Sequence, residues 1–216
     1  MTDVGSCEHA ALPSTRYKAY ADCAGGTGSD SFAFAIAHRS GNVAVLDVLR
    51  EFKPRFIPAQ VIDSLAQLCK AYNGIHEVQG DKYAVGFHQA EWRTHGIRFV
   101  ACDRSTSENY LALLPLLLAG RARLLDNKTL RGQLSALERR VGAGDRETVT
   151  HPQHASAHDD VACASCRALA LAAKYGSYPT DLSWVNGPTE NAAEEFQQAR
   201  FERHIFQHSG FYRQWR

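Results

Sequence analysis

Residues 20–34 read YADCAGGTGSDSFAF: an apolar run that ends in an acid, a glycine-rich turn, and a second run of aromatic and small residues. A Walker-type phosphate loop requires a lysine followed by Ser or Thr at its end, and a helix that begins directly after it. This loop contains no lysine, and residues 31–37 alternate large and small side chains as a strand does. A dinucleotide-binding fingerprint fails for the same reason, because it also requires a helix after the loop. The stretch therefore predicts that Asp22 ends one strand and that a turn leads into a second, an arrangement that points to a metal-binding carboxylate.

Composition places few limits on function. The chain has 216 residues, of which 44% are hydrophobic and 22% charged, enough for one domain with a full core and an appendage. Its net charge of +1 predicts no particular partner, so a nucleic-acid surface would have to be local. Six cysteines are scattered through the chain without a signal peptide, which indicates a reducing compartment. The longest apolar run, Tyr110–Gly120, is far shorter than the roughly 20 residues that cross a bilayer.

Hydrophobic periodicity predicts the order of the secondary-structure elements. We expect three strands in succession, at residues 17–23, 31–38 and 42–53, with a tight hairpin turn at Gly41. A helix follows, because hydrophobic residues between Val61 and Cys69 recur at helical spacing. Beyond it we expect strands at 75–79, 97–102 and 122–125, and helices at 87–96, 108–119, 128–141 and 159–175. Three antiparallel strands followed by this alternation predict an α/β fold with one mixed sheet and helices on both faces.

The two ends of the chain differ from this core. Residues 1–15 show no periodicity and are expected to form a flexible lead-in. The core domain is expected to span residues 16–175. Residues 176–216 begin with a turn-rich stretch and end in interleaved aromatic and basic residues, which predicts an appendage outside the core.

Three acids from separate elements could meet at one place. Asp22 ends the first strand, Asp81 follows the fourth, and Asp160, with Asp159 beside it, opens the last helix. Clustered carboxylates repel one another and stay ionised only beside a cation, and their hard oxygen atoms suit Mg²⁺ or Mn²⁺. Two such ions ~3.5–4 Å apart would activate water for phosphodiester cleavage. Taken singly, each acid is better explained as a turn residue or a helix cap.

Four stretches of the sequence carry a family resemblance. They are YADCAGGTGSDSFAFAIAH, VQGDKYAVGFHQAEWRTHGIRF, SENYLALLPLLLAGRARLLDNKTLRGQLSALERR and AHDDVACASCRALA, and together they extend over roughly residues 17–173. In these stretches the chain resembles the carboxy-terminal nuclease domain of tailed-bacteriophage terminase large subunits. The resemblance implies a ribonuclease H-like fold and a metal-dependent endonuclease that uses two Mg²⁺ or Mn²⁺ ions.

The resemblance also implies a role for individual residues. Asp22 is similar to the family's first metal ligand, which would bridge the two ions, and Asp81 to the second. The third ligand falls in the HDD sequence, where Asp160 is the choice and Asp159 is the alternative, as a ligand or as an orienting residue. His158 is close enough in sequence to serve as a partner of the ligands or as a proton carrier.

Substrate and partners follow from the same resemblance. We expect double-stranded viral concatemers as the substrate, cut in the host cytoplasm during genome packaging. The terminase ATPase domain, the small terminase subunit and the portal protein are the expected partners, with no membrane involved. The chain lacks a Walker A lysine and a Walker B strand, so we expect it not to translocate DNA by itself. The alternatives are another ribonuclease H-like nuclease, such as a resolvase or transposase-like enzyme, and a non-catalytic docking module for portal or motor.

Basic residues gather between positions 121 and 146. They are Arg121, Arg123, Lys128, Arg131, Arg139, Arg140 and Arg146. These side chains could follow a DNA backbone, each adding salt-dependent affinity, or could form an ordinary solvated helix face.

Overall fold

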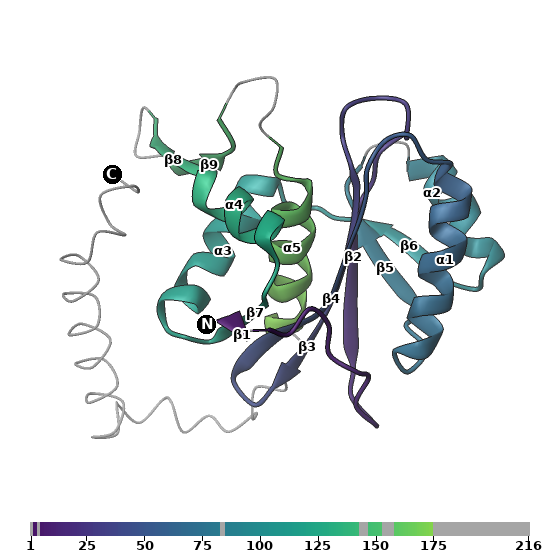
Figure 1. Cartoon of the computed structure of the whole chain (residues 1–216), viewed down its shortest axis with the longest axis horizontal. Helices are drawn as coiled ribbons and strands as arrows, with labels where there is room; N and C mark the ends of the chain where they lie inside the picture. Colours follow the sequence, from purple (N-terminus) through teal and green to yellow (C-terminus); the bar gives the residue numbers. More distant parts are fainter. Residues whose placement is uncertain (1, 4, 83–84, 143–146, 153–157, 175–216) are drawn as a thin grey trace. The chain divides into compact units, whose positions relative to one another are not determined.

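A mixed sheet forms the centre of the computed structural model, which describes residues 2–3, 5–82, 85–142, 147–152 and 158–174. In these residues the sheet has seven strands in the order β1-β7-β4-β3-β2-β5-β6 (Figure 1). The strands are β1 (Thr2–Asp3), β2 (Tyr17–Asp22), β3 (Phe32–Ser40), β4 (Val43–Phe52), β5 (Glu77–Gly80), β6 (Arg98–Ala101) and β7 (Ala122–Leu125). β3 is antiparallel to both β2 and β4, whereas β5 and β6 continue parallel to β2. The expected mixed sheet is therefore confirmed.

Five helices in the described part cover both faces of the sheet. They are α1 (Pro58–Ala71), α2 (Val85–Thr94), α3 (Thr106–Leu118), α4 (Lys128–Ala136) and α5 (Asp160–Lys174). In Figure 1 the sheet is seen nearly edge-on, with α1 and α2 on one side and α3 and α5 on the other. The described residues belong to one compact unit, residues 1–175, and the appendage expected at 176–216 lies outside them.

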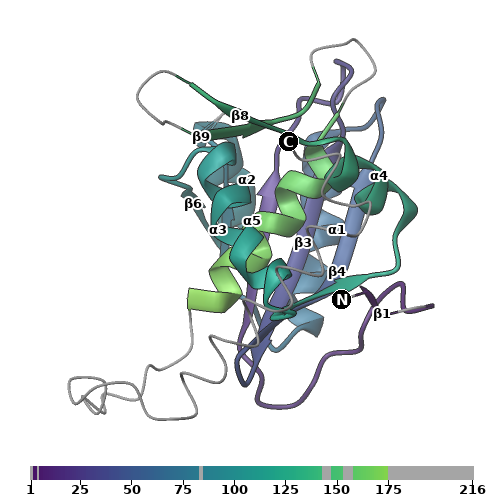
Figure 2. The same cartoon turned by 90° about the vertical axis from the view of Figure 1, so that its left-hand side faces the viewer.

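The alternation of large and small side chains in β3 explains why the two faces of the sheet pack differently against the helices. Phe32, Phe34 and Ile36 are fully buried in the core on the α1 side. The intervening residues are alanines, also fully buried, and they face α5. Because α5 is itself rich in alanine, small side chains meet on this side and the helix lies directly across β2, β3 and β4 (Figure 2). The first residue of α5 is thereby brought to the edge of the sheet where β2 ends.

One predicted helix is wrong over its last turn. The expectation was a helix over 128–141, but α4 ends at Ala136, and β8 (Glu138–Val141) pairs with β9 (Glu147–Thr150) as an antiparallel hairpin. Leucines at helical spacing suggested a longer helix, yet Val141 is 63% exposed and gains nothing from helical burial. The hairpin instead buries Val149, whose backbone N–H donates to the Ser107 hydroxyl at the start of α3. Tertiary packing on α3 therefore overrides the local pattern.

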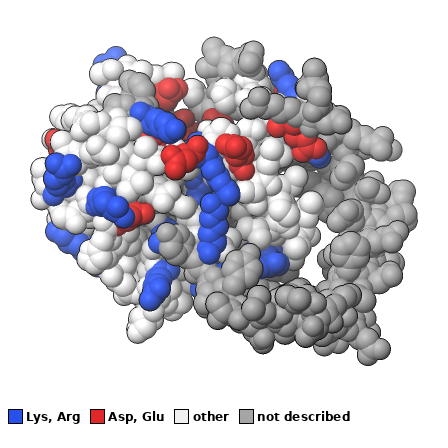
Figure 3. Space-filling model, turned by 180° about the vertical axis from the view of Figure 1, so that it is seen from behind, with Lys and Arg blue, Asp and Glu red and all other residues white. Residues whose placement is uncertain are grey.

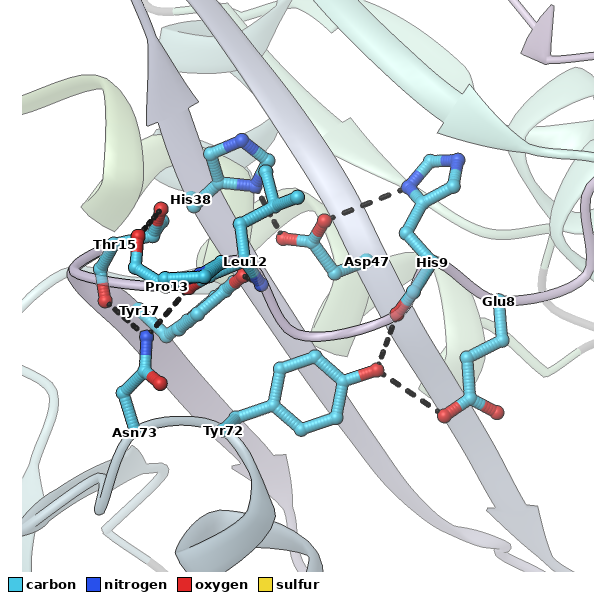
Figure 4. A network of polar contacts seen from close by, with 10 residues as sticks. All are labelled: Glu8, His9, Leu12, Pro13, Thr15, Tyr17, His38, Asp47, Tyr72 and Asn73. Atoms are coloured by element: carbon cyan, nitrogen blue, oxygen red, sulfur yellow. Dashed lines mark hydrogen bonds and ion pairs between the residues drawn. The ribbon is translucent and has the colours of Figure 1, made fainter.

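A polar network ties residues 9–12 to the sheet on the α1 side (Figure 4). The register between β3 and β4 shifts at Ile36/Ala37, so β4 carries an extra residue there. The buried carboxylate of Asp47 lies 2.7 Å from Nδ1 of His38 and 3.5 Å from Nδ1 of His9. The Tyr72 hydroxyl donates to the His9 carbonyl, and the Tyr17 hydroxyl accepts from the backbone of Leu12. Part of the segment expected as a lead-in therefore contacts the core.

The buried ring of His88 in α2 makes the stability of the folded chain depend on pH. The ring is 2% exposed, contacts the rings of Phe32, Phe87 and Phe99, and its Nδ1 has no hydrogen-bond partner in the described part. Burial lowers the pKa of His88 below its ordinary value of 6.5. As the pH falls below that value, the unfolded chain takes up a proton that the folded chain does not, so stability decreases.

We therefore expect the melting temperature to fall less between pH 7 and pH 5 in His88→Leu than in the wild type. Calorimetric unfolding at several pH values measures this difference. The other titrating groups are common to both proteins and cancel in the comparison. Parallel pH profiles for the two proteins would contradict a neutral buried imidazole.

Candidate active site

Two of the expected acids lie side by side at one edge of the sheet. Asp22 is the last residue of β2, and Asp81 directly follows β5. β2 and β5 are parallel with Ala21 opposite Gly80, so the next residue of each strand is an acid. Neighbouring strands are about 4.8 Å apart. The register of two parallel strands therefore accounts for the approach of these carboxylates.

Asp160 joins them from the start of α5, the helix that packs across β2, β3 and β4. It is the first residue of α5, and its Oδ2 accepts a hydrogen bond of 3.0 Å from the backbone N–H of Ser31. Ser31 directly precedes β3, in which Ala33 is the register partner of Asp22. The glycine-rich turn after β2 thus ends in a backbone donor that fixes the third acid close to the first.

The charges of the three acids act on one another. Burial and, to a smaller extent, the charges of Asp81 and Asp160 together raise the pKa of the Asp22 carboxyl to about 7, while a hydrogen bond from Cys163 opposes the rise. Burial also raises the pKa of Asp160, against the hydrogen bond from Ser31. The protein thus holds carboxylates where their ionised form is disfavoured. A cation would relieve this cost.

Two residues of α5 that the sequence analysis did not assign also belong to this site. Cys163 and Arg167 lie three and seven residues after Asp160, so helical spacing puts them on the same face. Both are buried, at 4% exposure each. Cys163 hydrogen bonds to Asp22. The guanidinium of Arg167 lies over the ring of Tyr20, 4.8 Å from its centroid, and donates to the Tyr20 hydroxyl and, at 2.7 Å, to Oγ1 of Thr106.

Neighbouring residues of the HDD sequence point to different partners. Oδ2 of Asp159 accepts a 2.8 Å hydrogen bond from the Tyr110 hydroxyl of α3. His158 lies with its Nδ1 3.7 Å from Oδ1 of Asp30 in the glycine-rich turn. The charge of His158 lowers the pKa of Asp160, so its ring is at the edge of the acidic group. Of the two adjacent acids, Asp160 therefore faces the carboxylate cluster, whereas Asp159 joins α5 to α3.

Glu51 is a fourth acid near this edge that the sequence did not single out. It lies near the end of β4, opposite Ala33, which is itself opposite Asp22, so the three positions form one row across the sheet. Its Oε1 accepts a 3.1 Å hydrogen bond from the Ser31 hydroxyl. Ser31 therefore contacts Asp160 through its backbone and Glu51 through its side chain. The sequence signal was weak, because Glu51 lies in a strand with no turn or helix end to mark it.

The chemistry of this donor set fits a divalent cation, although the side chains do not form a closed cage. In the part of the chain that the structure describes, no three His, Cys, Asp or Glu side chains lie close enough together to hold an ion. The cluster nevertheless provides hard oxygen donors with mutual repulsion, which is what Mg²⁺ and Mn²⁺ relieve. A bound ion would have to draw these acidic side chains closer together.

Among the described residues on the face seen in Figure 3, acidic and basic side chains are mixed and form no broad region of one charge. Several of the basic residues expected to follow DNA have partners in the described part: Arg131 pairs with Asp126, Arg139 with Glu147 and Arg140 with Glu138. These pairs favour the solvated-surface interpretation of the three arginines. No helix among the described residues is both long enough and apolar enough to span a bilayer.

Comparison with solved structures identifies the fold. No family model matches the sequence, and no curated protein matches it significantly. The structure is similar to the large terminase nuclease from the thermophilic phage G20c, with a TM-score of 0.60 and 19% identity over 77% of this chain and 86% of that one. The large terminase nuclease domain of Thermus phage P74-26 gives a TM-score of 0.57 and 18% identity over 74% of this chain and 81% of that one.

A longer protein matches over the same region. The large terminase of bacteriophage HK97 gives a TM-score of 0.60 and 12% identity over 76% of this chain but only 41% of the terminase. The G20c nuclease has also been solved with bound magnesium and with bound cobalt. The fold of this chain is that of the large terminase nucleases, which are ribonuclease H-like, as the sequence predicted.

Proposed function

We propose that this chain is the nuclease of a tailed-phage terminase, a metal-dependent endonuclease that cuts double-stranded concatemeric DNA during genome packaging. The observation that carries the proposal is the approach of Asp22, Asp81 and Asp160 from three elements, with the pKa of Asp22 raised by burial and by the other two charges. The similarity to solved terminase nucleases supports the same activity. The terminase ATPase, the small subunit and the portal protein remain the proposed partners.

Each acid would have a distinct part in holding Mg²⁺ or Mn²⁺. Asp22, at the centre, would bridge two ions, with Asp81 and Asp160 each holding one side. When bound, the ions would activate a water molecule and stabilise the leaving oxygen of the cleaved phosphodiester. His158 is placed at the edge of the group, where it could carry a proton to or from solvent.

The surrounding residues would keep the ligands in place. Cys163 hydrogen bonds to Asp22, and the Ser31 backbone donates to Asp160, so both carboxylates have a fixed neighbour before any ion binds. Tyr110 holds Asp159 on the α3 side, and this contact orients the start of α5. Such supporting contacts typically change metal affinity or activity by 10- to 100-fold when removed.

Metal binding should be visible as a gain in stability. With Mn²⁺ at about a hundred times its dissociation constant, binding adds about 2.7 kcal/mol, which for a domain of this size is a rise in melting temperature of roughly 5–10 °C. We expect this rise in the wild type and its loss in Asp22→Asn. Thermal unfolding with and without Mn²⁺ measures it. Asp63→Asn, which changes an exposed acid of α1, is the matched control and should keep the rise.

The activity itself is tested on supercoiled plasmid. We expect nicked and linear products with Mn²⁺ or Mg²⁺, and none when EDTA removes the metal. Cleavage that continues in EDTA, or that is unchanged by Asp22→Asn, would contradict the proposed site. An equal thermal shift in the wild type and Asp22→Asn would show that the ions bind elsewhere.

A further inference from the structure

A cavity of about 290 Å³ opens beside the carboxylate cluster, on the α5 side of the sheet. It lies between β2 and β5, the segment that follows β6, and helices α3 and α5. The lining residues that matter here are Tyr20, Gln79, Asp103, Arg104, Arg167 and Lys174. Tyr20 and Gln79 are register partners on β2 and β5, so they form one row of the cavity wall.

The cavity wall is cationic. Three of its side chains are basic and one, Asp103, is acidic. Arg104 and Lys174 are exposed, and no carboxylate of the described part lies within ion-pair distance of either. Arg167 is buried, and its Nε has no hydrogen-bond acceptor among the described residues. Buried donors of this kind are usually satisfied, so the unpaired Nε favours an anionic ligand in the cavity.

The cavity and the carboxylate cluster share two elements, β2 and α5. Tyr20 is two residues before Asp22 on β2, a separation of about 7 Å. On α5, Asp160, Arg167 and Lys174 recur every seven residues and so lie along one stripe of the helix. This stripe begins at the carboxylates and ends at the cations. Because α5 rises about 1.5 Å per residue, Arg167 and Lys174 lie about 10 and 21 Å along the helix from Asp160.

We propose that this cavity binds a phosphate group of the nucleic-acid strand that the carboxylate cluster would cut. The inference rests on the proposed nuclease function and adds a subsite to it. Arg104 and Lys174 supply the charge at the opening, and the buried Arg167 contributes positive charge to the wall. The cavity positions the strand and takes no part in breaking the phosphodiester bond.

The subsite is tested by the salt dependence of DNA binding, measured in EDTA so that cleavage does not interfere. Each phosphate contact contributes about 0.9 to the slope of log affinity against log salt concentration. We expect Arg104→Gln/Lys174→Gln, which removes the contact to this one phosphate, to reduce that slope by about 0.9 for a labelled 20-base-pair duplex. The matched control, Lys70→Gln/Arg93→Gln, removes the same charge from α1 and α2 and should leave the slope unchanged.

Competition distinguishes a DNA phosphate from a free one. We expect ATP and inorganic phosphate at millimolar concentration to displace little DNA from the wild type. An equal slope in the two double variants would overturn the proposal, as would ATP displacing DNA from the wild type but not from Arg104→Gln/Lys174→Gln. Because binding is measured without metal, a chain that fails to cut plasmid still tests the subsite independently.

Discussion

Replacing Asp160 with asparagine should lower the rate of Mn²⁺-dependent DNA cleavage by about 10³-fold, which corresponds to about 4 kcal/mol of lost transition-state stabilisation. The substitution removes one charge from the acidic cluster but keeps an oxygen that can accept from the Ser31 backbone. The helix start should therefore remain in place while the metal loses a ligand. Single-turnover cleavage of a labelled duplex measures the effect without interference from product release.

The neighbouring acid provides the control. Asp159→Asn removes the same charge one residue earlier, but its carboxylate accepts a hydrogen bond from Tyr110 on α3. We expect a smaller loss of about 10- to 100-fold, typical of a residue that orients ligands. If Asp159→Asn impaired cleavage as much as Asp160→Asn, the assignment of Asp160 alone as the third metal ligand would be contradicted. Equal and full activity in both variants would remove α5 from the site.

Trp92→Ala should destabilise the domain by about 3–5 kcal/mol, because it opens a cavity in a core that has little freedom to collapse. The side chain is fully buried and stacks on Phe34, with ring centroids 6.1 Å apart. For a domain of this size the melting temperature should fall by roughly 6–20 °C. Denaturant unfolding followed by circular dichroism measures the free energy directly.

Two variants separate burial from other effects. Phe87→Ala removes an exposed ring from the same helix and should cost less than about 1 kcal/mol. Trp92→Phe keeps an aromatic ring against Phe34 and removes an indole N–H that has no acceptor in the described part, so its cost should lie well below that of alanine. Since Trp92 packs on the α1 side, cleavage by Trp92→Ala below its melting temperature should match the wild type. A loss of cleavage without a loss of stability would contradict this placement.

Much of the fold could be predicted because local patterns agree with the tertiary structure. The alternation of Phe32, Phe34 and Ile36 with alanines marks β3 and shows which face takes each helix. The position of Asp22 after a strand and before a glycine-rich turn is equally visible in the sequence. Once β2 and β5 are taken as parallel neighbours, the approach of Asp22 and Asp81 follows from their register.

Other features depend on contacts that no local pattern records. The β8–β9 hairpin forms where leucines predicted helix, because Val149 packs against α3 across a long sequence separation. Cys163 and Arg167 could have been found by helical spacing from Asp160, but buried cysteines and arginines in a helix carry no signal of their own. The different partners of Asp159 and Asp160 are set by Tyr110 and Ser31, which are distant in the sequence.

The order in which these residues are translated has a consequence for the proposed activity. α5 closes the described core, and Asp160 emerges 138 residues after Asp22. At about 5–20 residues per second, a nascent chain carries its first acid for roughly 7 to 28 s before the third exists. During that interval the polypeptide can fold most of its sheet but lacks one of the three acids, so the proposed nuclease activity would begin only after α5 has been translated.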